Sequence, residues 1–274
     1  MPAGCVIGVD LGGTKLLAGA VDGSLAVHHR ASRRAAGAAG DELVALAVSA
    51  VAEVRDASES EVGAVGVALP AGSSASDVLA ERVGVPVFAG PRGALATLAE
   101  HRAGAARGYS EALVLTIGTS IGGGVVADGR VVEDAVLALD EHVSAGALAR
   151  EGLRVARATP ESSLARALAA GREISGAVVI EHAYDGDRAA RDILALLGVR
   201  LGAGIEDLVE RLRPAVVVVG GSMVAAGDML LEPARAVGTA HGVPVVPARF
   251  GAESAMLGAA VLAFDGLGAA AAAA

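Results

Sequence analysis

Residues 6–23 of the chain are VIGVDLGGTKLLAGAVDG, and residues 112–129 are ALVLTIGTSIGGGVVADG. The two stretches align without gaps at an offset of 106 residues, so that the Asp22-Gly23 pair matches Asp128-Gly129. Each stretch reads as an apolar strand, a glycine turn, a second apolar strand and an Asp-Gly hairpin turn. A repeat of this kind indicates two similar halves of one architecture.

Segments outside this repeat alternate between helical and extended patterns, and this alternation predicts an α/β fold. We expect two lobes, residues 1–110 and 111–274, with a central cleft between them and with the last helix packing back on the first lobe. Apolar residues recur at helical spacing in 41–54, 187–212 and 252–264, and short apolar runs typical of buried strands occupy 62–69, 85–89 and 215–219.

The composition excludes several classes of partner. The chain carries 22 basic and 31 acidic residues, a net charge of −9, so that a nucleic acid backbone meets net repulsion. Only two Tyr and three Phe are present and there is no Trp, which leaves little for base stacking. We therefore expect a nucleotide or another small anionic ligand, held by backbone and polar groups, and no nucleic acid.

The single cysteine, Cys5, cannot form an internal disulfide or a cysteine-based metal site. The N-terminus lacks the basic-then-apolar pattern of a secretion signal, and we expect a cytoplasmic protein. Long uncharged stretches such as 112–127 and 215–227 are shorter than the roughly 18 to 20 residues that span a bilayer, so we expect no membrane insertion.

The first glycine turn is a candidate phosphate-binding loop. In Asp10-Leu11-Gly12-Gly13-Thr14-Lys15, the glycines let the backbone approach a ligand, and successive N–H groups can hold phosphate oxygens. Thr14 and Lys15 can donate to the same oxygens, and Asp10 is the candidate magnesium ligand. The alternative is a plain glycine hairpin.

Two further glycine motifs are candidate cofactor-binding segments. The first motif contains Gly118, Thr119, Ser120, Gly122 and Gly123, and matches the first glycine turn across the repeat. Gly220 and Gly221 follow an apolar strand and can lie against an adenine ring, although a simple strand-to-helix turn explains them equally well. Neither motif fits the Walker or the dinucleotide-binding pattern. We expect the turns at 11–14 and 118–124 to face each other across one cleft.

Taken together, these residues resemble the ROK family of repressors and sugar kinases, whose sugar-kinase members include glucokinases and N-acetylmannosamine kinases. The resemblance implies an actin-like, ribonuclease H-like ATPase fold, ATP with Mg²⁺ as cofactor, and a homodimer. The repressors of this family carry an N-terminal helix-turn-helix, whereas here the phosphate-loop strand begins by Val6, and we therefore expect the chain not to be one of the repressors. The matching blocks are DLGGTK at 10–15, GVALPA at 66–71, IGTSIGGG at 117–124, RPAVVVVGG at 213–221 and GAESAMLGAAVLA at 251–263.

Three departures from the family pattern bear on function. Alignment with the family places Arg92 at the position of the general base, and a guanidinium has no acceptor for a proton. The stretch 70–85 is a short link where the family has a sugar-binding loop. Glu141 aligns with a family glutamate, but Ser144 takes the place of the following histidine and no cysteine follows, so we expect no zinc. Glu141 and His142 remain substrate candidates, with an ordinary solvated turn as the alternative.

These features favour a pseudokinase that binds a nucleotide or another ligand and has a regulatory or scaffold role. The alternative is an active ATP-dependent sugar or amino-sugar kinase with an atypical site, because phosphoryl transfer depends mainly on positioning and electrostatics. A structural protein without a ligand fits less well, since both glycine turns are intact. We expect Arg92 to bind an anion or to pair with an acidic residue such as Glu141; a side chain that points into solvent is the alternative.

Overall fold

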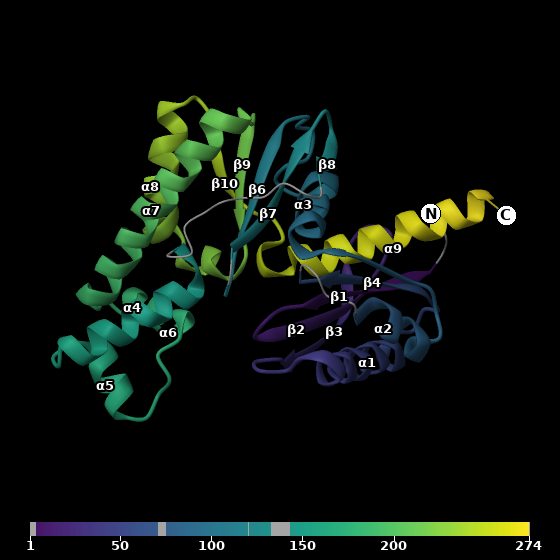
Figure 1. The fold of residues 1–274 in the computed structure, drawn as a ribbon, viewed down its shortest axis with the longest axis horizontal. Helices are drawn as coiled ribbons and strands as arrows, with labels where there is room; N and C mark the ends of the chain where they lie inside the picture. Colours follow the sequence, from purple (N-terminus) through teal and green to yellow (C-terminus); the bar gives the residue numbers. More distant parts are fainter. Residues whose placement is uncertain (1–3, 71–74, 120, 133–142, 274) are drawn as a thin grey trace. The chain divides into compact units, whose positions relative to one another are not determined.

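The structure is a computed structural model that describes residues 4–70, 75–119, 121–132 and 143–273 (Figure 1). The chain divides into two compact units: unit 1 comprises residues 1–107, 131–134 and 252–274, and unit 2 comprises residues 108–130 and 135–251. The chain contains two five-stranded sheets with helices packed against them, one in each unit, except that residues 131–132 of β8 (Arg130–Val132), the last strand of the second sheet, are assigned to unit 1. This mixed α/β architecture confirms the fold class predicted from the sequence.

Unit 1 is built on a sheet with the strand order β3-β2-β1-β4-β5. The central strand β1 pairs antiparallel with β2 and parallel with β4, and every residue of β1 is buried. The strands of unit 1 are β1 (Cys5–Leu11), β2 (Lys15–Val21), β3 (Val27–Arg34), β4 (Val62–Leu69) and β5 (Val87–Pro91). Its helices are α1 (Gly40–Ala57), α2 (Ala75–Val83), α3 (Arg92–Ala103) and α9 (Ser254–Ala273).

Unit 2 contains a sheet with the order β10-β9-β6-β7-β8, which read from its other edge repeats the order of unit 1. Here β6 takes the place of β1, pairing antiparallel with β7 and parallel with β9. The strands are β6 (Ala112–Ile117), β7 (Ile121–Ala127), β8 (Arg130–Val132), β9 (Val216–Gly220) and β10 (Val245–Pro247). The helices are α4 (Ala145–Ala158), α5 (Ser163–Ala169), α6 (Gly176–Tyr184), α7 (Arg188–Leu212) and α8 (Asp228–Ala240), and a short 3-10 helix spans Ser222–Ala226.

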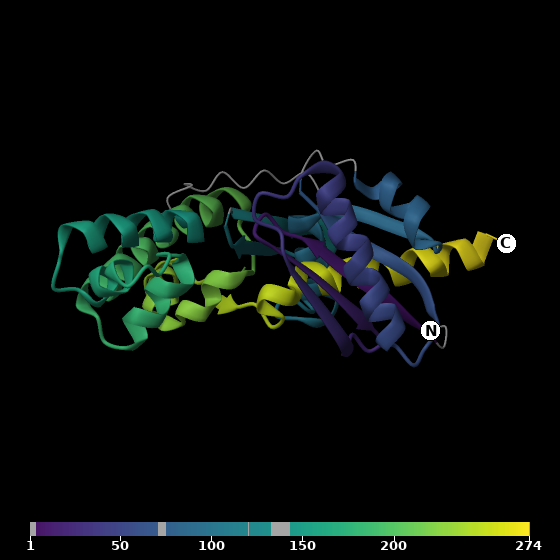
Figure 2. The same cartoon turned by 90° about the horizontal axis from the view of Figure 1, so that it is seen from below.

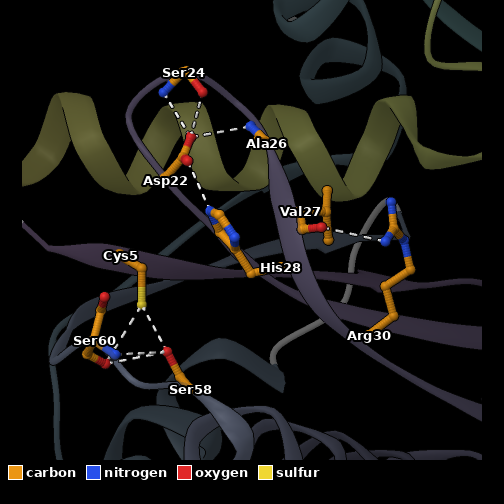
Figure 3. Close-up of polar contacts among 9 residues, drawn as sticks. All are labelled: Cys5, Asp22, Ser24, Ala26, Val27, His28, Arg30, Ser58 and Ser60. Atoms are coloured by element: carbon orange, nitrogen blue, oxygen red, sulfur yellow. Dashed lines mark hydrogen bonds and ion pairs between the residues drawn. The ribbon is translucent and has the colours of Figure 1, made fainter.

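The repeat seen in the sequence therefore extends over all five strands of each sheet. Strand β7 begins 106 residues after β2, at Ile121 and Lys15, as the gapless alignment predicts. The Asp-Gly pairs differ in detail. Asp128 and Gly129 both have positive φ, 50° and 72°, in the tight turn before β8. Asp22 instead closes a longer turn by accepting hydrogen bonds from the backbone N–H of Ser24 and Ala26 (Figure 3).

The last helix of the chain, α9, belongs to unit 1, where it packs on β1, β4 and α3. Two glycines of the sheet allow this close approach. A Cβ atom at Gly8 would lie 2.2 Å from the carbonyl oxygen of Met256, and one at Gly66 would lie 1.8 Å from that of Ala259. Figure 2 shows α9 crossing the strands of unit 1. The sheet of unit 1 is thus covered by α1 on one face and by α9 on the other.

Most elements predicted from periodicity are confirmed. Strand β4 matches the predicted 62–69, α1 contains the predicted 41–54, and α7 begins one residue after Asp187, which is its N-cap. Helix α9 runs to Ala273, beyond the predicted 252–264, because its C-terminal part is rich in alanine, the residue with the highest helix propensity.

Among the described residues, one helical segment, Gly251–Ala272, is long and apolar enough by length and composition to span a membrane, with a mean hydropathy of 1.7. Its N-terminal half is a core element of unit 1. Met256, Leu257, Ala259 and Val261 are each at most 2% exposed. Core helices of globular proteins pass the same test of composition.

Candidate functional site

The first glycine turn joins β1 to β2 at the carboxyl end of β1. Its backbone is closed by a 3.1 Å hydrogen bond in which the N–H of Gly12 donates to the carbonyl of Lys15. A Cβ at Gly12 would lie 2.6 Å from that carbonyl oxygen, so the turn requires glycine at this position. Gly13, Thr14 and Lys15 are exposed and therefore accessible to a ligand. The predicted phosphate-binding residues of this motif thus lie together at one edge of the sheet.

Arg92 lies at the same edge because three parallel strands end there. In the sheet register Asp10 is opposite Ala68 on β4, and Leu69 is opposite Pro91 on β5. Arg92 follows Pro91 directly as the first residue of α3. Parallel strands place their carboxyl ends at one edge, so residues 82 positions apart in the chain come within reach of each other.

The guanidinium of Arg92 binds the carboxylate of Asp10 through two hydrogen bonds. Nε donates to Oδ1 at 2.5 Å, and Nη2 donates to Oδ2 at 2.9 Å. This is the two-pronged geometry that makes arginine–carboxylate pairs specific. The Asp10 side chain is 6% exposed, whereas that of Arg92 is 38% exposed, so the pair presents mainly its guanidinium to solvent.

The electrostatics of the pair favour a permanently charged Arg92. Burial alone would lower the pKa of Arg92, but the hydrogen bonds and the charge of Asp10 outweigh burial and raise it above its ordinary value. The sequence predicts either an anion or an acidic partner for Arg92. The structure shows Asp10 as an acidic partner of Arg92, while Glu141 lies outside the described residues.

A magnesium ion at Asp10 does not fit the described residues. Both carboxylate oxygens of Asp10 accept hydrogen bonds from Arg92, so a Mg²⁺ ion would have to compete with the guanidinium for the same two oxygens. The guanidinium also places a positive charge where the ion would bind. In the part of the chain that the structure describes, no group of three or more His, Cys, Asp or Glu residues is arranged to hold a metal ion. The absence of zinc stays a prediction for metal analysis.

The second glycine motif lies in unit 2, at the carboxyl end of β6. Gly118 accepts a 2.7 Å hydrogen bond from the N–H of Ala145, the first residue of α4. Gly122 is opposite Thr116 in the β6–β7 hairpin, where a Cβ would lie 3.1 Å from Oγ1 of Thr116. Thr119 is exposed. Ser120 lies outside the described residues.

Gly220 and Gly221 lie beside this second motif, because Gly220 pairs with Thr116 across the β6–β9 ladder. Gly221 has φ of 85°, and a Cβ there would lie 2.4 Å from the carbonyl oxygen of Ile117. Unit 2 therefore brings the second and third glycine motifs together at one sheet edge. Figure 1 shows the two strands that carry them, β6 and β9, side by side.

The residues after the second hairpin are only partly described. Glu141 and His142, the substrate candidates, lie outside the described residues. Ser144, which takes the place of the family histidine in the alignment, is buried and caps α4 by accepting a hydrogen bond from the N–H of Ala147 at 3.1 Å. Its hydroxyl thus has a structural task in the helix terminus.

The sequence did not point to one buried carboxyl group in unit 1. Glu100 of α3 is fully buried and accepts hydrogen bonds from the Ser254 hydroxyl and from the N–H of Ala105, both at 2.8 Å. It therefore ties the end of α3 to the start of α9. An acidic residue within an otherwise apolar helix face is the signal that would have found it.

Comparison with known proteins places these features in a family. The family model described as "ROK family" matches residues 73–136 and 139–265. A glucokinase from Streptomyces coelicolor is 28% identical over 85% of this chain and 86% of its own length. A glucokinase from Thermotoga maritima is 29% identical over 86% of this chain and 87% of its own length. A bifunctional NanE/NanK enzyme of Brucella melitensis is 27% identical over 96% of this chain and 54% of its own length.

Solved structures agree with this assignment. A ROK family glucokinase from Streptomyces griseus in complex with glucose and AMPPNP has a TM-score of 0.86 at 26% identity, covering 96% of this chain and all of that one. A ROK hexokinase from Thermus thermophilus has a TM-score of 0.69 at 26% identity, covering 97% of this chain and 99% of that one. The fold is accordingly that of the sugar kinases of the actin-like ATPase class. The family model covers more than half of the sequence, and the chain belongs to the ROK family.

Proposed function

We propose that this ROK-family chain is a sugar-kinase-like protein that binds the phosphate groups of a nucleotide but transfers phosphate to sugars very slowly or not at all. Its role would then be regulatory or that of a scaffold. The observation that carries the proposal is the paired Arg92 and Asp10, because Arg92 stands where the family has its general base and at the same time engages the candidate magnesium ligand.

The chemistry of the pair supports slow or absent catalysis. A sugar hydroxyl must lose its proton during phosphoryl transfer, and a guanidinium that stays charged has no lone pair to accept one. Loss of a general base costs roughly 10²–10⁴ in rate. The short stretch 70–85, where the resemblance implies a longer sugar-binding loop, would weaken sugar binding in addition.

The exposed glycine turns support retained phosphate binding. Gly13, Thr14 and Lys15 in unit 1 and Thr119 in unit 2 face solvent at the carboxyl ends of central strands. Ligands of open α/β sheets bind at this end of the strands. Backbone N–H groups and the lysine ammonium are suited to phosphate oxygens.

The second candidate function is an active sugar or amino-sugar kinase that uses a different base. The likeness to glucokinases over 85% or more of the chain favours it, as does the S. griseus glucokinase structure with glucose and AMPPNP bound. In this case, a positioned water or a residue outside the described ranges would accept the proton.

One pair of measurements separates the two functions. Calorimetric titration with ATP measures nucleotide binding, and coupled detection of ADP measures turnover on glucose, mannose and N-acetylmannosamine with Mg²⁺ present. We expect ATP to bind and turnover to stay below about 0.01 per second. Turnover at an ordinary enzyme rate of about 1–10³ per second would establish the active kinase instead.

A homodimer and a cytoplasmic location are further proposals for this chain. The resemblance to the ROK family supports the dimer, and the single cysteine fits a reducing compartment. Light scattering after size-exclusion chromatography measures the oligomeric state directly, and a mass of one chain would contradict the dimer.

A further inference from the structure

In the pair between Asp10 and Arg92, the cationic group faces solvent and the anionic group is buried, and this arrangement matters for ligand binding. The carboxylate is buried on the sheet side, at 6% exposure, and the guanidinium covers it from the solvent side at 38% exposure. A ligand that approaches the first glycine turn would therefore meet the cation and not the anion. The Arg92 Nη2 atom also lies 3.5 Å from the place of a Cβ at Gly12, so the guanidinium borders the turn itself.

The hydrogen-bonding capacity of Arg92 is not used up by Asp10. A guanidinium carries five N–H groups, and two of them donate to Asp10. Within the described part of the chain, Arg92 has no polar partner besides Asp10. Its remaining N–H groups are thus available to oxygen atoms of a ligand, in the planar arrangement that suits phosphate.

The same arrangement leaves no place for a divalent cation. Magnesium in phosphate sites neutralises phosphate charge and is held by one or two carboxylates. At this site each carboxylate oxygen of Asp10 accepts a hydrogen bond from Arg92, whose guanidinium itself brings a positive charge to the phosphate turn. Arg92 therefore meets the electrostatic requirement that a metal ion meets elsewhere.

We infer that Arg92 replaces the divalent cation at the first glycine turn, so that the chain binds a triphosphate chain without a metal ion. This inference rests on the proposed nucleotide binding and deepens it, since it states which form of the ligand the site prefers. Free ATP carries more negative charge than its magnesium complex, and a site with a fixed guanidinium favours the free form.

The test is calorimetric titration of the whole chain with ATP and with inorganic tripolyphosphate, each in excess EDTA and in excess Mg²⁺. For the unaltered protein, we expect the affinity for ATP in EDTA to equal or exceed the affinity for ATP in Mg²⁺. Tripolyphosphate binding in EDTA would show that the phosphate chain is enough, and ATP binding alone would show that the nucleoside adds contacts. Either result supports a metal-free site.

Two variants give opposite expectations. Arg92→Met should weaken binding in EDTA by about tenfold or more, because it removes charged hydrogen bonds to the ligand. Asp10→Asn leaves the guanidinium in place and frees it from its anionic partner, so binding in EDTA should be retained or strengthened. If Asp10 held a metal ion instead, the unaltered chain would bind only with Mg²⁺ present, and Asp10→Asn would abolish that binding. Arg102→Met, which removes an exposed ion pair with Asp265 elsewhere in unit 1, is the matched control.

The outcomes separate this inference from the proposed function. If the unaltered protein binds ATP only with Mg²⁺, the inference is wrong while nucleotide binding stands. If ATP and tripolyphosphate fail to bind under both conditions, nucleotide binding and the inference both fail. If Arg92→Met does not fold, the Asp10→Asn result still decides, because loss of metal-free binding in that variant would contradict a site built on Arg92.

Discussion

Asp10 is a buried carboxylate whose charge is balanced by one flexible side chain. Breaking a buried ion pair from one side costs about 3–5 kcal/mol, since it leaves a charge without compensation. Arg92 is 38% exposed, so water can partly solvate Asp10 after its removal. We expect Arg92→Met to lower the free energy of unfolding by about 1–3 kcal/mol, measured by urea denaturation.

A double variant isolates the ion pair from other effects of the substitution. Asp10→Asn combined with Arg92→Met removes both charges, and we expect it to be more stable than Arg92→Met alone. The exposed pair of Arg102 and Asp265 gives the comparison, because surface ion pairs contribute only about 0–1 kcal/mol. A strictly additive double variant would mean that the two side chains do not interact in solution.

Asp187 offers a pH-dependent test in unit 2. It caps α7 by accepting a 2.9 Å hydrogen bond from the N–H of Ala190, and it also accepts hydrogen bonds from the N–H and hydroxyl of Ser163 at 2.6 and 2.7 Å. Burial acts to raise the pKa of Asp187, but these hydrogen bonds outweigh it and hold the pKa below the ordinary 3.8.

A folded-state pKa below the unfolded-state pKa stabilises the fold above the unfolded value and loses this effect as pH falls through the folded value. Thermal unfolding of Asp187→Asn should therefore occur at a lower temperature than that of the unaltered chain at pH 7. The expected loss of stability is about 0.3–1 kcal/mol, because asparagine keeps a capping oxygen but loses the negative charge at the helix N-terminus. The difference should shrink below about pH 4. Asp192→Asn, at an exposed site with a 3.9 Å ion pair, should show no such convergence.

At the residue scale, the tight glycine turn could be predicted from a run of six residues. The magnesium-ligand role predicted for Asp10 does not fit the pairing of its carboxylate with Arg92. The partner of Arg92 could not be predicted in this way, because it depends on the parallel register of β1, β4 and β5, which joins residues 82 positions apart. Arg92 was placed by family alignment, and its acidic partner could be found only once three strand ends met.

At the scale of elements, the packing of α9 on the sheet depends on the absence of side chains. Gly66→Ala would place a Cβ 1.8 Å from the carbonyl oxygen of Ala259, which is backbone and cannot move without shifting the helix. We expect the free energy of unfolding to fall by about 2–4 kcal/mol, which is at or above the cost typical of overpacked cores. Denaturant unfolding followed by circular dichroism measures it.

Strand β4 supplies its own matched control. Gly63 is exposed, and a Cβ there would lie 3.2 Å from a methyl carbon of Leu267, the end of a flexible side chain. Gly63→Ala should therefore change stability by less than about 1 kcal/mol, because alanine loses less backbone entropy than glycine on folding. Equal destabilisation by the two substitutions would contradict the helix packing described for α9.

The helices and strands could be predicted from the sequence where one face of the element carries a regular apolar pattern. Helix α7 and strand β4 have long, regular apolar patterns, and their bounds agree with the sequence prediction almost to the residue. Strand β5 begins at Val87 instead of residue 85, since Pro86 lacks the N–H needed to join a sheet ladder. The register between strands was not predictable, because glycine-rich strands present few side chains that fix it.

At the scale of the whole molecule, segments that pack in one unit are far apart in the sequence. Unit 1 contains the first 107 residues together with the last helix, so its core is completed by residues at the far end of the sequence. Ala259 and Ala255 of α9 share a buried cluster with Ala68, Leu95 and Ala96. The stability of unit 1 thus depends on a segment that follows all of unit 2 in the chain.

Truncation after Gly251 tests this dependence within each unit. It removes α9, exposes the faces of β1 and β4 that carry Gly8 and Gly66, and takes the Ser254 hydroxyl from the buried Glu100. Hydrogen exchange followed by mass spectrometry should show loss of protection in β1 and β4, while β6 and β9 keep theirs, because the core of unit 2 does not include α9.

Truncation after Leu267 removes only the exposed end of the helix and should leave all four strands protected. Equal loss of protection in both sheets after the longer truncation would mean that the two units fold as one cooperative structure, and unchanged protection in β1 would mean that α9 contributes little to the core in which it is buried.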